Sequence, residues 1–145
     1  MDHGPLVTGQ EVFNLGFATA AVLSLITFGV HTLIGGKYVA RPLLVPSELP
    51  KASLWLNYFT WHMATVMLLF MAAGFGWAAV HRDAFDVAVL LMLMAAVFSP
   101  LCIWVALKGD IAPWRFPASW LFLLILAAGL WGAHIANWLT LFPGG

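Results

Sequence analysis

Four long apolar stretches, separated by short polar connections, dominate the pattern of the chain. The apolar stretches cover about 12–35, 52–80, 84–107 and 116–141. Each exceeds the ~20 residues that a helix needs to cross the hydrocarbon core of a bilayer. Helices are expected because every backbone N–H and C=O in lipid must be paired within its own segment. The pattern therefore predicts an all-α, up-down transmembrane four-helix bundle in one domain, residues 1–145.

Composition supports the membrane assignment and excludes several classes of function. The 145-residue chain is 63% hydrophobic and only 8% charged, whereas soluble domains carry roughly 25% charged residues. The formal net charge is zero, so nothing in the composition points to a nucleic-acid partner. A single cysteine excludes an intrachain disulfide. The first residues lack the pattern of a cleaved signal peptide, so we expect the first apolar stretch to remain in the protein.

The basic residues predict the orientation. Five of the six Lys and Arg residues lie in the first and third connections, at Lys37, Arg41, Lys51, Lys108 and Arg115. By the positive-inside rule, these connections are expected on the cytoplasmic side of a bacterial inner membrane, with both termini outside. Tryptophans near the predicted helix ends fit aromatic belts at both interfaces. They include Trp55, Trp114 and Trp120 at the cytoplasmic ends and Trp77 at the outer end.

Small and polar residues mark the faces expected to pack. Helices in lipid associate through close approach of small residues and through polar contacts rather than through the hydrophobic effect. Such residues recur at helical spacing on each apolar stretch, and Pro100 is expected to kink the third helix beside Ser99. The predicted contact stripes are Ala20, Ser24, Thr27 and His31 on the first helix, and Tyr58, His62, Thr65, Ala72, Ala73 and Gly76 on the second. On the third helix they are Ala88, Met92, Ala95, Ser99 and Cys102, and on the fourth Ala128, Gly132 and Ala136, with Gly129 and Ala133 beside them.

Two histidines are the main chemical candidates. His31 and His62 lie on the first two stripes, in the same cytoplasmic half as Cys102. Imidazole is the commonest metal ligand, and ionisable residues inside a membrane are functional candidates. The pair suggests a bis-His haem b site, or a transition-metal site that includes Cys102. Two imidazoles on one iron would require helices farther apart than the about 8–10 Å of touching neighbours.

Structural roles for the same histidines remain open. His31 could hydrogen-bond to Thr65 or to a backbone carbonyl, and His62 to Thr27 or Tyr58, because polar side chains commonly join helices in membranes. A proton path or a small-molecule pocket is a further alternative.

A second polar group is expected near the outer surface. It consists of Glu11, Asn14, Asp86, His134 and Asn137. Polar residues at helix ends near lipid head groups are ordinary, whereas a divalent-metal site or a docking site for a partner is the functional alternative.

Residues 31–65 carry a motif that resembles a known group of sequences. The motif is His31-Thr32, Gly35, Arg41-Pro42-Leu43-Leu44, and Trp61-His62 with Thr65. It resembles a family of small, uncharacterised bacterial multi-pass membrane proteins, although members often have an acidic residue where this chain has Gly36. The resemblance implies that His31 and His62 belong together, and it implies no activity.

The sequence favours a non-catalytic protein over an enzyme. No phosphate-binding loop or nucleophile–base pair is visible, and the connections are short. We expect an accessory subunit of a larger membrane complex, or a homo-oligomer, that docks through its apolar outer faces. The alternative is a haem b- or metal-binding redox protein that uses His31 and His62.

Overall fold

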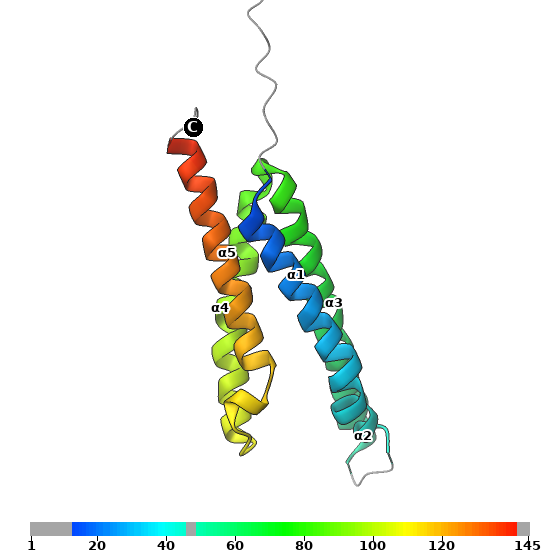
Figure 1. Ribbon diagram of the computed structural model, residues 1–145. Coiled ribbons are helices and arrows are strands. Elements are labelled where there is room, and N and C mark those ends of the chain that lie inside the picture. Colours follow the sequence, from blue (N-terminus) through cyan, green and yellow to red (C-terminus); the bar gives the residue numbers. More distant parts are fainter. Residues whose placement is uncertain (1–12, 46–48, 142–145) are drawn as a thin grey trace, which may run out of the picture.

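The computed structural model describes residues 13–45 and 49–141, and the helices account for nearly all of them (Figure 1). In chain order the elements are α1 (Leu15–Gly29), η1 (Val30–Ala40), α2 (Arg41–Leu43), α3 (Lys51–Val80), η2 (Arg82–Ala84), α4 (Phe85–Lys108), η3 (Pro113–Arg115) and α5 (Ala118–Leu141). Among the described residues, four helical segments are long and apolar enough to cross a membrane. The predicted all-α four-helix bundle is confirmed, and it fits a multi-pass membrane protein.

The helices form two antiparallel hairpins. The first hairpin consists of α1, with its continuation η1, packed on α3; the second consists of α4 packed on α5. The hairpins meet mainly through α1 and α5, and α3 and α4 touch less. Figure 1 shows the hairpins close together at the end where α3 passes into α4, and diverging toward the end that carries α2 and η3. Consecutive helices therefore run up and down, as expected.

The buried core draws side chains from all four helices. Phe17, Phe75, Met92 and Ile125 belong to one continuous cluster. Phe17 lies beside Phe75, with ring centroids 6.4 Å apart. The predicted stripe on α1 is confirmed, because Ala20, Ser24 and Thr27 are buried. The Ser24 hydroxyl donates to the Ala20 carbonyl of its own helix, so it enters the core without an unpaired donor.

Glycine allows α1 and α5 to approach closely near the N-terminal end of α1. A Cβ atom added at Gly16 would lie 2.3 Å from the backbone nitrogen of Gly132 and 2.4 Å from its Cα atom. A Cβ atom at Gly132 would in turn lie 2.8 Å from the backbone nitrogen of Phe17. These clashes involve main-chain atoms, which cannot rotate away. The contact between the two hairpins at this point therefore depends on glycine in both helices.

Asn14 joins three helices at the same end. Its side-chain Nδ2 donates to the Gly132 carbonyl of α5 at 2.8 Å, and its backbone N–H donates to the Ala79 carbonyl of α3 at 2.8 Å. Its Oδ1 accepts from the Phe17 N–H at 3.1 Å and so caps the N-terminus of α1. Asparagine is a favoured N-cap because its oxygen pairs with one of the free N–H groups in the first turn.

The first helix is longer than the sequence pattern predicts. We expected it to end near Gly35, but helical structure continues to Leu43 as the π-helix η1 and the short α2. Gly35 and Gly36 do not break it, because packing against α3 supports the extra turns. In η1 the hydrogen bonds span five residues, and the N–H of Arg41 reaches the Gly36 carbonyl. Pro42, which has no N–H, is the second residue of α2.

The α4 helix continues through Pro100 and ends in a Schellman motif. The N–H of Ile111 donates to the Ala106 carbonyl at 2.8 Å, and Asp110 adopts a positive φ of 54° between them. Aspartate tolerates this left-handed conformation better than most residues. The Ser99 hydroxyl donates to the Ser119 carbonyl of α5 at 3.0 Å, so this side chain joins two helices.

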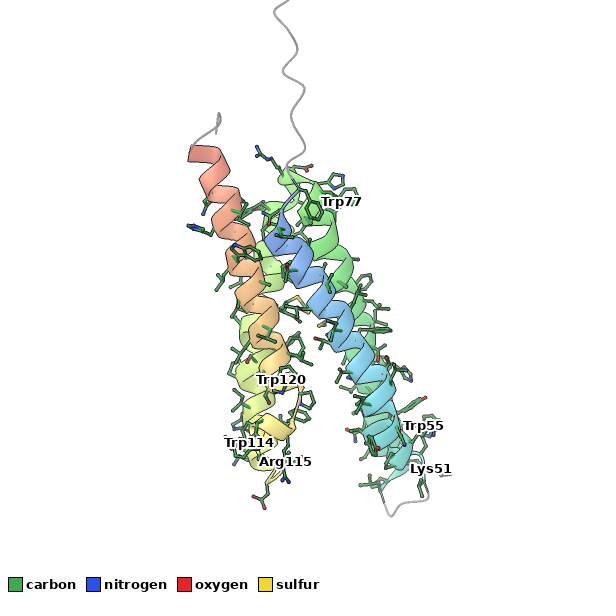
Figure 2. The ribbon with its side chains drawn as sticks, viewed as in Figure 1. Lys51, Trp55, Trp77, Trp114, Arg115 and Trp120 are labelled. Atoms are coloured by element: carbon green, nitrogen blue, oxygen red, sulfur yellow. The ribbon has the colours of Figure 1, made fainter. Side chains whose placement is uncertain are left out.

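Aromatic residues gather at both ends of the helices, as the sequence predicts. Figure 2 shows Trp55 beside Lys51 at one end of the first hairpin, and Trp114, Trp120 and Arg115 at the corresponding end of the second. Trp77 lies at the opposite end (Figure 2). Tryptophan and basic side chains anchor helices at the membrane surface, so the two ends of the hairpins correspond to the two interfaces.

Candidate functional site: a groove between the hairpins

A groove of about 610 Å³ opens between the hairpins where they diverge. One wall comes from α1, η1 and α3, and the other from α4, η3 and α5. The lining is almost entirely apolar. Its polar or reactive side chains are Thr27, His31, Tyr38, Trp61, Cys102 and Arg115. The two histidines of the sequence motif are divided by this groove, because His31 lines it and His62 does not.

His31 is held by Trp61. The imidazole stacks on the indole ring, with centroids 3.8 Å apart and planes inclined by 15°. Its Nε2 atom lies 3.2 Å from the Trp61 carbonyl oxygen. A carbonyl oxygen can only accept, so Nε2 carries the proton and Nδ1 is left as the acceptor of the neutral ring. The Thr65 hydroxyl donates to the same carbonyl at 3.1 Å. The predicted hydrogen bond from His31 to a backbone carbonyl is thus confirmed.

Gly35 leaves the space that the Trp61 ring occupies. A Cβ atom at Gly35 would lie 2.5 Å from the Cη2 atom of Trp61, whereas one at Gly36 would meet nothing within 4 Å. Three members of the sequence motif therefore meet at Trp61: His31 stacks on its indole ring, Gly35 leaves room for that ring, and the Thr65 hydroxyl donates to its carbonyl. The sequence drew attention to the two histidines, whereas the structure places Trp61 at the centre.

His62 lies on the exposed side of α3. Its ring meets Tyr58 edge-on, with centroids 4.5 Å apart, and this is a ring contact rather than the hydrogen bond to Tyr58 or Thr27 that the sequence suggested. The two helices that carry His31 and His62 are adjacent and in contact, which is the arrangement that suits a bis-His haem least. Haem ligation through Nε2 of His31 would also require its bond to Trp61 to break. Haem b binding by this pair stays a prediction.

The predicted metal ligands do not form a cluster. Across residues 13–45 and 49–141, no group of three His, Cys, Asp or Glu side chains is arranged to hold a metal ion. Cys102 is half-buried on the α4 wall of the groove, opposite the wall of His31. His31 and Cys102 therefore face a shared space, while His62 lies outside it.

Arg115 is the charged residue of the groove. It ends η3, directly before α5, and it is exposed. Deeper in the same wall, Phe98 of α4 and Phe122 of α5 meet edge to face, with centroids 5.3 Å apart. The wall thus changes from a cationic rim to an apolar interior. Sequence reasoning used Arg115 only for topology, because which loop borders the groove depends on how the two hairpins pack.

The residues of the outer polar group do not share one role. Asn14 is buried and its hydrogen bonds go to backbone groups of three helices. Asp86, His134 and Asn137 are exposed on α4 and α5. Glu11 lies outside the described residues. Asn14 therefore has a structural role in the bundle, and a metal or docking role for the other members stays a prediction.

No signal in the sequence singled out Trp61 among the eight tryptophans, apart from its place in the motif next to His62.

Comparison of the chain with known protein families, with curated proteins and with solved structures finds no match.

Proposed function

We propose that this protein is a non-catalytic membrane protein that binds one amphiphilic molecule of the bilayer in the groove between its hairpins. The observation that carries the proposal is the open, apolar groove of about 610 Å³. Binding sites for small molecules are typically apolar concavities of ~300–1,000 Å³ with a few well-placed polar groups. In this role the chain serves as an accessory subunit that supplies a bound amphiphile to a larger membrane complex.

The length of the groove suits an acyl chain. It extends along the first helix from Thr27 to Val39, which is at most about 18 Å at ~1.5 Å per residue. One leaflet contributes about half of the ~30 Å hydrocarbon core. Val30, Ile34, Met67 and other apolar side chains line this length. An acyl or isoprenoid tail can therefore be enclosed over about one leaflet.

The haem alternative is less well supported by the same geometry. It needs His31 and His62 to face one ligand, but only His31 lines the groove, and its Nε2 is engaged by Trp61. Amphiphile binding needs no such rearrangement, because it uses the groove as it stands.

Photo-crosslinking in nanodiscs tests the proposal. The probe is phosphatidylcholine with a diazirine in the middle of one acyl chain, and labelled peptides are identified by mass spectrometry. We expect labelling of Cys102, which lines the groove, and of Val97, which is 62% exposed on the outside of the same helix. Ala64→Phe should lower Cys102 labelling severalfold without changing Val97, because Ala64 is an exposed residue of the groove lining.

Ala73→Phe is the matched control for this experiment. Ala73 is an exposed residue of the same helix, α3, and does not line the groove. This variant should label like the wild type at both positions. Labelling confined to Val97 in the wild type, or equal loss of Cys102 labelling in both variants, would contradict the proposed function.

The groove should open toward the cytoplasm of a bacterial inner membrane. Supporting this, the open end carries the basic residues Lys37, Arg41, Lys51, Lys108 and Arg115, and positive charge is retained inside. A reporter fused after the last residue should accordingly show periplasmic activity, and cytoplasmic activity would reverse the orientation.

A further inference from the structure

We infer that the groove selects an anionic phospholipid, with the tail between the hairpins and the phosphate on Arg115. The inference rests on the proposed function, because it names the class of amphiphile that the same groove binds. Its observations are the position of Arg115 at the groove rim, the charge of that end of the molecule, and the apolar interior beyond it.

Arg115 is placed to bind a head group. It is exposed and lines the groove from η3, next to Trp114. Figure 2 shows both side chains at the end of the second hairpin, the end at which Trp55 and Lys51 mark the interface on the first. Within residues 13–45 and 49–141, no carboxylate pairs with Arg115. Its guanidinium is therefore available to a phosphate, for which its planar donors are well suited.

The opposite wall contributes a hydroxyl. Tyr38 of η1 lines the groove and is 66% exposed. The Lys37 ammonium lies 5.2 Å from the centroid of the Tyr38 ring, which places a further positive charge beside Tyr38. The rim of the groove thus carries Arg115 on one hairpin and Tyr38, with Lys37 beside it, on the other.

The charges at this end favour an anion over a zwitterion. The described residues of the open end include five basic side chains, Lys37, Arg41, Lys51, Lys108 and Arg115, and one acid, Asp110. A basic side chain near the membrane surface strengthens binding of anionic lipid about fivefold. A choline head group adds a cation that this end would repel. We therefore expect phosphatidylglycerol to be preferred over phosphatidylcholine with the same chains.

The apolar interior favours a ligand with a hydrophobic tail over a water-soluble anion. Behind Arg115 the lining consists of Phe116, Pro117, Leu121 and Phe122 on one wall. Burial of an acyl chain against such residues is favourable when the chain is taken from water, but it gains only packing when the chain is taken from lipid. The tail therefore sets where the molecule lies, and Arg115 sets which head group is chosen.

Competition with the photoactivatable phosphatidylcholine tests the inference. Unlabelled phosphatidylglycerol with matched chains should suppress labelling of Cys102 about fivefold more effectively than unlabelled phosphatidylcholine. Labelling of Val97 should respond equally to both lipids, because it reports the bulk bilayer. Arg115→Gln should abolish the preference at Cys102. Lys108→Gln removes a charge from the same end but not from the groove lining, and it should retain most of the preference.

The outcomes separate the inference from the function on which it rests. Equal competition by the two lipids, or an unchanged preference in Arg115→Gln, would overturn the head-group assignment while Cys102 labelling still supports amphiphile binding. Absence of Cys102 labelling would overturn both. Glycerol phosphate in the buffer should not compete; competition by this tail-free anion would contradict a site that needs head and tail together.

Discussion

Gly16→Ala is expected to lower the free energy of unfolding by about 1–3 kcal/mol, the usual cost of overpacking a close contact. The added Cβ atom would lie 2.3 Å from the Gly132 backbone nitrogen, more than 1 Å inside the 3.4 Å at which ordinary contact begins. The helices must separate, because no side-chain rotation relieves a clash between Cβ and backbone. Thermal unfolding of the purified protein in detergent, followed by circular dichroism, measures the effect.

Gly29→Ala is the control for this prediction. Gly29 lies on the same helix, but a Cβ atom there meets nothing within 4 Å. Alanine is favoured over glycine in a helix by about 1 kcal/mol, so this variant should be as stable as the wild type or more so. If Gly16→Ala behaved like Gly29→Ala, the close crossing of α1 and α5 would be refuted.

Asn14→Ala should lower stability by about 1–2 kcal/mol. The substitution removes the cap of α1 and leaves the Gly132 carbonyl without its 2.8 Å partner. Loss of an N-cap costs ~0.5–2 kcal/mol, and a buried polar group left unpaired adds to the penalty. Hydrogen bonds between membrane helices average ~0.6 kcal/mol, which limits the total loss of stability expected for this variant. The same unfolding measurement applies.

Asn57→Ala is the matched control for Asn14. Asn57 is exposed on α3, and its Nδ2 donates to the Ser53 carbonyl within the same helix at 2.8 Å. Its removal breaks a bond that water or lipid head groups can replace, so stability should change little. Asn14→Asp should recover the cap but not the donor to Gly132. Equal stability of the Asn14→Ala and Asn57→Ala variants would show that Asn14 does not hold the three helices together.

Stability and binding are assigned to opposite ends of the molecule. The Gly16–Gly132 crossing and Asn14 hold the hairpins together where α3 passes into α4. The groove lies at the other end, where the hairpins diverge. Variants of the crossing should therefore change the free energy of unfolding more than the preference for anionic lipid. Variants of Arg115 should change the lipid preference more than the free energy of unfolding. A groove open along one leaflet requires the hairpins to be joined elsewhere.

Several features follow from the sequence because they depend on local composition. Four apolar stretches above the spanning length predict four helices, since backbone groups in lipid have no other partners. The small-residue stripe of Ala88, Met92, Ala95 and Ser99 predicts the buried face of α4 correctly, because one helix period determines which side chains share a face. The basic residues at the helix ends likewise predict which end of the bundle carries the positive charge.

Other features required the tertiary structure. The sequence predicted that His31 and His62 belong together because they lie at similar depths in the membrane. In the structure, however, His62 faces outward from α3, and it is the neighbouring Trp61 that stacks on His31. The continuation of the first helix past Gly35 to Leu43 depends on its packing against α3. The groove lies between the hairpins where they diverge, at the end opposite the glycine crossing, and its walls come from residues far apart in the sequence. Depth along a helix can be counted from sequence, whereas the direction a side chain faces across an interface depends on how the helices pack.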